Sequence, residues 1–231
     1  MKLHDGYAYA QYFFSANNAA TYDSLVNYAT FGQDKMWKNQ IAKIVDKGGF
    51  KPSVILDLAA GTGILSSKLE AGSDAASVCS LDLTFDYLKK AKEKSRQTFL
   101  VNSTAELLPF QSGIFDYVVS SYLLKYIDIE TVAVESWRVL KQHGIVIFHD
   151  FTCPNNQVIQ KLWRLYFSLL KLSGKLIKEW EPAFQRLDEV ICKNRLWPID
   201  TSQCLRKIGF IEVSYQYHTL GTSAIVSARK P

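Results

Sequence analysis

An acid and two glycines at close spacing, Asp57, Gly61 and Gly63, are the first residues of this sequence that point to a specific chemistry. Asp57 lies in the apolar run 54–58, and the two glycines follow this run. An amphipathic segment begins directly after Gly63. This is the pattern of a buried strand, a tight turn and the start of a helix. Glycines in such a turn let a ligand approach the backbone closely.

The type of ligand depends on two further positions. The nicotinamide and flavin fingerprint has a third glycine where this chain has Ser66, and the Asp57 carboxylate would repel a pyrophosphate. The pattern therefore favours a ligand with a positively charged end. The alternative is an ordinary glycine turn that binds nothing.

A second acid, Asp82, ends the next apolar run, 78–83. An acid at the carboxyl end of the second strand can accept hydrogen bonds from both ribose hydroxyls of an adenosine. Since dinucleotides also contain adenosine, Asp82 supports nucleoside binding rather than any one reaction.

The elements that position these residues alternate along the chain. Apolar runs predict five strands, and amphipathic segments between them predict helices, which implies parallel strands with right-handed crossovers. Two alternating runs around Gly221 predict a closing antiparallel hairpin. The strands are expected at 54–58, 78–83, 99–101, 115–121, 145–151, 209–217 and 222–228, and the helices at 34–47, 85–94, 129–140, 158–177 and 202–207.

The expected fold is therefore α/β and Rossmann-like. It has a seven-stranded, mostly parallel sheet, a C-terminal antiparallel hairpin and a helical insert after the fifth strand. One domain, 1–231, is expected, with an N-terminal helical cover at 1–50 and a helical lid at 155–197. Along 158–178 apolar and basic residues alternate; this segment either packs on the domain or forms a lid that touches an anionic membrane surface.

Net charge, cysteine content and the lengths of the apolar runs indicate the partners and the cellular compartment to expect. The net charge of +5, from 27 basic and 22 acidic residues, is mild and does not indicate nucleic-acid binding. Four dispersed cysteines predict neither a disulfide framework nor a metal site, and they favour a reduced, cytoplasmic setting. The first residues contain no apolar signal region, and no apolar run is long enough to span a membrane.

The D-x-x-x-G-x-G pattern resembles motif I of the class I S-adenosylmethionine-dependent methyltransferases. Nearly the whole chain resembles one branch, the ubiquinone/menaquinone biosynthesis C-methyltransferases. The segments that carry this resemblance are Tyr22-Asp23 with Asn27, Phe31-Gly32, Trp37, 57–63, 105–110, 138–141 with Gly144, 150–154, 174–176, Trp197-Pro198, Gly209-Phe210, Val213, Tyr215 and 219–221.

The resemblance implies S-adenosylmethionine as cofactor and a lipid-like quinol as methyl acceptor. The cofactor-binding residues it implies, together with those of the glycine turn, are Asp57, Ala59, Gly61, Thr62, Gly63, Asp82, Leu83, Thr104, Ala105, Glu106 and Ser121. The chain departs from the family pattern in three places. Thr104 replaces an acid, Lys125-Tyr126 replaces Arg-Asn, and the usual aromatic-rich stretch of the insert is reduced to 184–187.

Methylation of a quinol ring carbon requires that a neighbouring hydroxyl lose its proton. Asp150 is the preferred candidate for the base, and Lys125 is the candidate for stabilising the phenolate. Tyr122 is a third catalytic candidate, with Tyr126 and His218 as further possibilities. His149 lies on an expected buried strand, where a packed histidine is the simpler interpretation.

Two other functions stay open at the level of the sequence. One is methylation of another small apolar or lipid substrate, and the other is a non-catalytic scaffold that binds the cofactor. The expected partners are the quinol, a membrane surface along 158–178 and a second copy of the chain in a homodimer; no metal is expected.

Overall fold

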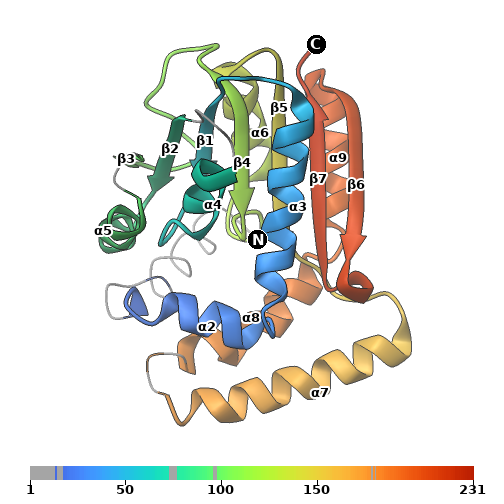
Figure 1. Ribbon diagram of the computed structural model, residues 1–231. Helices are drawn as coiled ribbons and strands as arrows, with labels where there is room; N and C mark the ends of the chain where they lie inside the picture. Colours follow the sequence, from blue (N-terminus) through green and yellow to red (C-terminus); the bar gives the residue numbers. More distant parts are fainter. Residues whose placement is uncertain (1–13, 15–17, 73–76, 96–97, 178, 180) are drawn as a thin grey trace.

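The computed structural model describes residues 14, 18–72, 77–95, 98–177, 179 and 181–231. Its centre is a seven-stranded sheet in the order β3-β2-β1-β4-β5-β7-β6 (Figure 1). The first five strands are parallel, and β7 pairs antiparallel with both β5 and β6. The strands are β1 Val54–Leu58, β2 Ser77–Asp82, β3 Phe99–Asn102, β4 Phe115–Ser121, β5 Leu140–Phe151, β6 Ile211–His218 and β7 Ser223–Arg229. The predicted fold class is confirmed.

Helices cover both faces of the sheet because side chains alternate along each strand. Ile55 of β1 packs among residues of α3 and α4, whereas Leu56 and Leu58 pack among residues of α6 and α9. The helices of these layers and of the edge beside β3 are α3 Gln33–Gly48, α4 Ile64–Gly72, α5 Phe85–Lys94, α6 Ile129–Val139 and α9 Trp197–Ile208.

A third layer lies below the carboxyl ends of the parallel strands in Figure 1. It consists of α2 (Tyr22–Ala29), α7 (Gln157–Gly174) and α8 (Glu181–Lys193). These helices share an apolar cluster with Trp37 and Tyr122 of the sheet domain. Of the expected N-terminal cover, 1–50, residues 1–13 and 15–17 lie outside the described residues, and its described part contains α2 in this layer and α3 on the sheet.

Two elements begin five residues earlier than predicted. Strand β5 begins at Leu140 rather than 145, because Leu140 already pairs with Phe115 ahead of an irregularity in the ladder. Helix α9 begins at Trp197 rather than 202, because Pro198 occupies the first turn, where a proline is well tolerated.

The expectation of no disulfide is wrong. Cys153, just after β5, is bonded to Cys192, near the end of α8. The two residues are 39 positions apart, and the antiparallel return of α7 and α8 brings them together, which cysteine spacing alone does not reveal. Cys79 and Cys204 are free thiols.

None of the helices in the described part of the chain is both long and apolar enough to cross a membrane. Within the same residues, no group of three or more potential metal ligands occurs.

Candidate active site

The glycine turn after β1 is held by the acid at the end of β2. Gly61 N donates to Asp82 Oδ2 over 2.8 Å, and Thr84 N donates to Asp82 Oδ1 over the same distance. Gly61 has a φ of 57°, which favours glycine. At Gly63 a Cβ atom would lie only 2.8 Å from that of Ala91, so this glycine also allows close packing of the turn on α5.

Asp57 lies buried beneath this turn. Ser66 Oγ donates to its Oδ2 over 2.6 Å and lies the same distance from Ser80 Oγ. Burial raises the pKa of the Asp57 carboxyl to about 7, although the hydrogen bond from Ser66 opposes this shift. Ser66 therefore supports the carboxylate at the position where a dinucleotide fold has its third glycine.

A cavity of about 810 Å³ opens above the turn at the carboxyl ends of β1, β2 and β4. Most residues expected to bind the cofactor line it: Ala59, Gly61, Asp82, Leu83, Thr104, Ala105, Glu106 and Ser121. Phe14, Tyr22, Tyr87 and Tyr126 form an aromatic side of this cavity, and none of them was among the residues expected to bind the cofactor. The concentration of aromatic residues in the N-terminal segment was the available signal.

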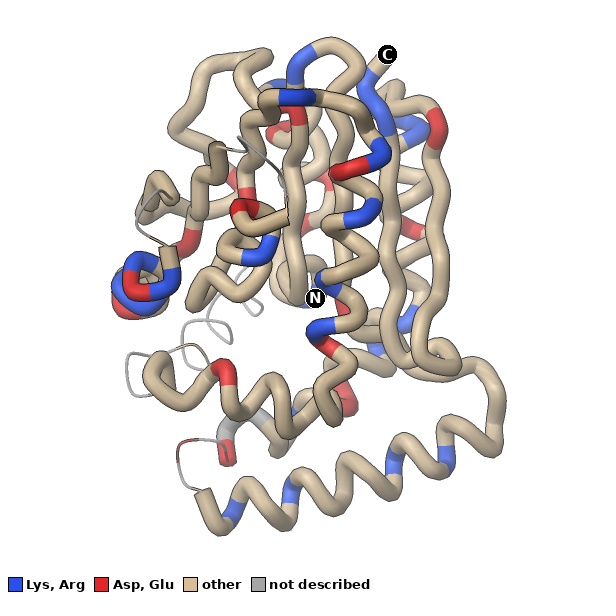
Figure 2. The backbone as a smooth tube through the Cα atoms, viewed as in Figure 1, with Lys and Arg blue, Asp and Glu red and all other residues tan. Residues whose placement is uncertain are grey.

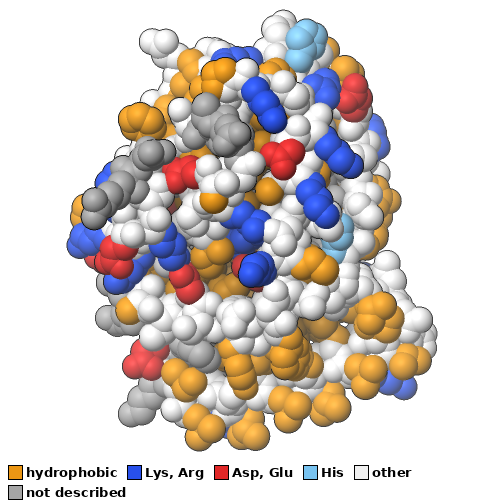
Figure 3. Space-filling view, viewed as in Figure 1, with side chains coloured by type: hydrophobic (Ala, Val, Ile, Leu, Met, Phe, Trp, Pro, Cys, Tyr) orange, Lys and Arg blue, Asp and Glu red, His pale blue; other side chains and the backbone are white. Residues whose placement is uncertain are grey.

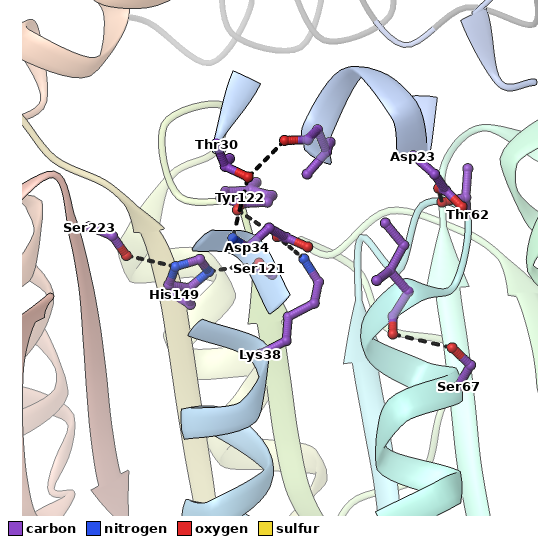
Figure 4. Close-up of polar contacts among 12 residues, drawn as sticks. Asp23, Thr30, Asp34, Lys38, Thr62, Ser67, Ser121, Tyr122, His149 and Ser223 are labelled. Atoms are coloured by element: carbon purple, nitrogen blue, oxygen red, sulfur yellow. Dashed lines mark hydrogen bonds and ion pairs between the residues drawn. The ribbon is translucent and has the colours of Figure 1, made fainter. Parts of the chain in front are cut away.

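Asp57 and Thr62 instead line an adjoining cavity of about 340 Å³, together with Lys38 of α3. Thr62 Oγ1 donates to Asp23 of α2 (Figure 4). Lys94 Nζ donates to the Thr62 carbonyl over 2.7 Å. The glycine turn is thus tied to α2 from below. Gly63 is not among the residues that line either cavity.

Lys125 and Asp150, two of the catalytic candidates, form a buried ion pair. Lys125 Nζ lies 2.7 Å from Asp150 Oδ1 and also donates to the Tyr122 carbonyl over 2.7 Å. Asp150 Oδ1 further accepts from Phe151 N, while Asp150 Oδ2 is buried with no hydrogen-bond partner in the described structure. Burial lowers the pKa of Lys125, and Asp150 opposes that shift.

Tyr122, the third candidate, belongs to a second buried network that the sequence did not reveal. Its hydroxyl donates to Asp34 Oδ1 over 2.7 Å, and Asp34 also pairs with Lys38 (Figure 4). Burial, together with Asp34, raises the pKa of Tyr122 well above its ordinary value. The phenol is therefore protonated at neutral pH and serves as a hydrogen-bond donor.

His149 is packed in the sheet. Its Nδ1 lies 2.7 Å from Ser121 Oγ and its Nε2 lies 2.8 Å from Ser223 Oγ, so both ring nitrogens have partners (Figure 4). Burial lowers the pKa of His149 well below its ordinary value. His218, the other histidine considered, lines a groove between α3 and the C-terminal hairpin and neither of the cavities above.

An apolar cavity of about 440 Å³ adjoins the first one and shares Phe14, Tyr22, Tyr122 and Tyr126 with it. Helices α2 and α8 supply most of the other walls, and Lys125 lines it from the sheet side. The remaining lining residues are Leu25, Val26, Ala29, Thr30, Phe151, Phe184 and Leu187. Asp150 does not line it.

The larger cavity fits an adenosyl cofactor. Each Asp82 oxygen accepts one backbone N–H and keeps a lone pair for a ribose hydroxyl. Leu83 and Ala105 offer apolar contacts to a purine ring. The Asp57 carboxyl and the glycine turn border the adjoining cavity, which suits the charged methionine end of S-adenosylmethionine.

Comparison with known proteins agrees with this geometry. The model of the ubiE/COQ5 methyltransferase family matches residues 5–230. The ubiquinone/menaquinone biosynthesis C-methyltransferase UbiE of Shewanella halifaxensis is 31% identical over 219 residues, which cover 90% of this chain and 85% of that protein.

Solved structures share the fold at low sequence identity. A SAM-dependent methyltransferase of Thermotoga maritima is 15% identical with a TM-score of 0.64, covering 98% of this chain and 100% of its own. Phosphoethanolamine N-methyltransferase 2 of Haemonchus contortus, solved with S-adenosyl-L-methionine, is 17% identical with a TM-score of 0.59, covering 84% of this chain and 52% of its own. The chain thus belongs to the ubiE/COQ5 methyltransferase family and is an S-adenosylmethionine-dependent methyltransferase.

Proposed function

We propose that this enzyme methylates a ring carbon of a prenylated quinol, of the demethylmenaquinol or ubiquinol-precursor type. The observation that carries the proposal is the apolar cavity that adjoins the cofactor cavity and contains one buried lysine, Lys125. An apolar ring and the first part of a prenyl chain match its walls, and the lysine matches a phenolic oxygen. The name of the Shewanella relative, at 31% identity, supports the same class of acceptor.

In this proposal Asp82 holds the ribose hydroxyls of the cofactor, and Leu83 with residues 104–106 borders the adenine. Thr62 and Asp57 lie toward the methionine end, where an ionised Asp57 attracts the positive charge. Thr104 contributes a hydroxyl where the family has an acid, so the adenine contact relies on neighbouring backbone groups. When bound, S-adenosylmethionine supplies a methyl group that its sulfonium has already activated.

The acceptor is prepared by Lys125. The Lys125 side chain lines the apolar cavity, where the low dielectric strengthens the attraction of its ammonium group for an anionic oxygen. A phenolic hydroxyl beside this cation ionises more readily and gives its proton to water as the acceptor enters, so that the neighbouring ring carbon becomes nucleophilic; the proton of that carbon leaves to water after the methyl group has been added. Asp150 lies behind Lys125 and holds Nζ in place, so we assign it a positioning role rather than that of the base. Tyr122, fixed by Asp34, forms the wall between the two cavities.

The test is an assay of the full chain with S-adenosylmethionine and a panel of reduced acceptors. The panel contains a demethylmenaquinol and a ubiquinol precursor, each with a short prenyl chain, their unprenylated head groups and a simple phenol. We expect a ring-methylated product from a prenylated quinol, identified by mass and NMR, and a much higher KM for its unprenylated head group. The variant Lys125→Met should lower kcat at least a hundredfold, the range of general acid–base and electrostatic contributions.

Lys141→Met is the matched control, because Lys141 also pairs with a buried aspartate, Asp116, away from both cavities. This variant should keep its activity. Methylation of oxygen, or turnover of the simple phenol alone, would show that the acceptor is another small apolar molecule. Binding of S-adenosylmethionine without turnover of any quinol would contradict the proposal.

A further inference from the structure

Helix α7 has two apolar faces, of which one is buried against the described part of the chain and the other is exposed. The buried face contributes Trp163, Phe167 and Leu170 to the apolar cluster that includes α8. Gly174 is also buried on this face. The second face is an apolar stripe at steps of three and four residues, whose members are between 58% and 83% exposed. The apolar stripe consists of Val158, Leu162, Leu165, Leu169 and Leu172 of α7, together with Leu176 just after its end.

The apolar stripe is bordered by cations. Lys161, Arg164 and Lys175 are exposed, and none of them has an ion-pair partner in the described structure. Helix α7 contains no acidic residue, and in Figure 2 its tube is marked by basic residues only. Lys171 differs from the other three because it pairs with Asp188 of α8.

The loop between α2 and α3 extends this surface. The ring of Phe31 is 75% exposed and lies 4.9 Å from that of Tyr166, on the side of α7 next to the apolar stripe. The space-filling view shows hydrophobic side chains gathered along this lower edge of the molecule (Figure 3). Exposed apolar side chains in one row with unpaired cations are unusual on a surface that faces only water.

We propose that the apolar stripe and its cations dock the enzyme on the surface of an anionic phospholipid membrane. The leucines enter the boundary between head groups and acyl chains, and the cations contact the lipid phosphates. Charge favours this occupant over a second copy of the chain, since two such helices packed together would bring unpaired cations against each other. The helix lies along the membrane and does not cross it.

Docking through this face also places the apolar cavity relative to the membrane, an inference that rests on the proposed function. The apolar cavity takes its walls from α2 and α8, and these helices pack in one cluster with α7. Docking through α7 therefore holds that cavity next to the lipid phase. A prenylated acceptor would then place its head group at Lys125 while its chain stays among the lipids.

The test is co-sedimentation of the full-length protein with vesicles, without cofactor or acceptor. Vesicles of phosphatidylcholine are compared with vesicles of phosphatidylcholine and phosphatidylglycerol in equal parts. We expect binding to the anionic vesicles that weakens as salt rises. The triple variant Leu162→Gln/Leu165→Gln/Leu169→Gln should bind at least about tenfold less tightly. The triple variant Lys161→Gln/Arg164→Gln/Lys175→Gln should lose about a hundredfold in affinity for the anionic vesicles, given the contribution of each basic residue at such a surface.

Matched controls remove the same groups elsewhere. Leu107→Gln/Val134→Gln/Ile211→Gln removes exposed apolar side chains, and Lys43→Gln/Lys47→Gln/Lys51→Gln removes the same positive charge. Both should bind like the unmodified chain. Absence of binding to anionic vesicles would overturn the proposal. So would light scattering that shows a dimer which the leucine variant converts to a monomer, because the stripe would then join two copies. Neither result depends on which acceptor is methylated.

Discussion

Lys125 Nζ and Asp150 Oδ1 lie 2.7 Å apart, and their side chains are only 5% and 1% exposed. Asp150 belongs to the end of β5, whereas Lys125 follows β4, so the pair joins the ends of neighbouring strands. Removing one member of a buried pair leaves an uncompensated charge, which costs about 3–5 kcal/mol. The pair therefore couples stability and chemistry at one position.

The first prediction separates these two effects. Asp150→Leu should lower the free energy of unfolding by about 3 kcal/mol or more, whereas the double variant Lys125→Met/Asp150→Leu should recover most of the loss. Urea unfolding measures both. The double variant should nevertheless stay inactive, because it lacks the cation that we propose prepares the acceptor. Normal turnover by the folded double variant would remove Lys125 from the mechanism.

The second prediction concerns Asp82. Asp82→Ala removes the acceptor for Gly61 N as well as the proposed ribose contact, so calorimetry should show at least a tenfold weaker affinity for S-adenosylmethionine. Asp82→Asn keeps one acceptor oxygen and should lose less. Asp86→Ala, which removes a partly exposed acid of α5 that pairs with Lys89, is the control. Equal affinity for all three variants would place the cofactor elsewhere.

Local patterns predicted the sheet and the glycine turn because their signals are contained in short stretches. The apolar runs mark the strands, and the acid at position 82 follows from its place at a strand end. The missed features depend on contacts between distant segments. Tyr122 meets Asp34 of α3, and Cys153 meets Cys192, only after the helical layer has closed on the sheet. Asp150 lines neither the cofactor cavity nor the apolar cavity, and strand periodicity did not reveal that it would pair with Lys125.

The third prediction follows from the pKa of Asp57, which burial raises from 3.8 to about 7. Between these values the folded protein holds a proton that the unfolded chain has lost. Stability should therefore fall as pH rises from about 4 to 7, by up to roughly 4 kcal/mol, and level off above. Urea unfolding of the unmodified protein and of Asp57→Asn at a series of pH values tests this, because the variant should lack this contribution.

The same ionisation should affect cofactor affinity. An ionised Asp57 attracts a positively charged ligand, so binding of S-adenosylmethionine should tighten as pH rises through 7. Calorimetry on Asp57→Asn should show a weaker dependence on pH. If the two proteins show the same pH profile, Asp57 does not contact the charged end of the cofactor.

The fourth prediction concerns His149, whose pKa burial lowers well below 6.5. Below pH 6.5 the unfolded chain binds a proton that the folded protein does not, so this group makes stability fall as pH decreases from 6.5. The sign is opposite to that of Asp57. His149→Gln should lose this part of the acid sensitivity in urea unfolding, whereas His143→Gln, at an exposed position, should keep it. Unchanged acid sensitivity in both variants would exclude this role for His149.

The last prediction concerns the disulfide between Cys153 and Cys192, which closes the helical insert. A crosslink over 39 residues restricts the unfolded chain, so its removal in Cys192→Ala should cost about 2–4 kcal/mol. In Cys192→Ala, hydrogen exchange should show a larger loss of protection in α7 and α8 than in the sheet, relative to the unmodified chain, because the bond joins the insert to the end of β5. Reducing agent should act in the same way on the unmodified chain and on Cys79→Ala/Cys204→Ala, which keeps the bond. Thiol titration of the unfolded, oxidised protein that found all four cysteines free would refute the pairing.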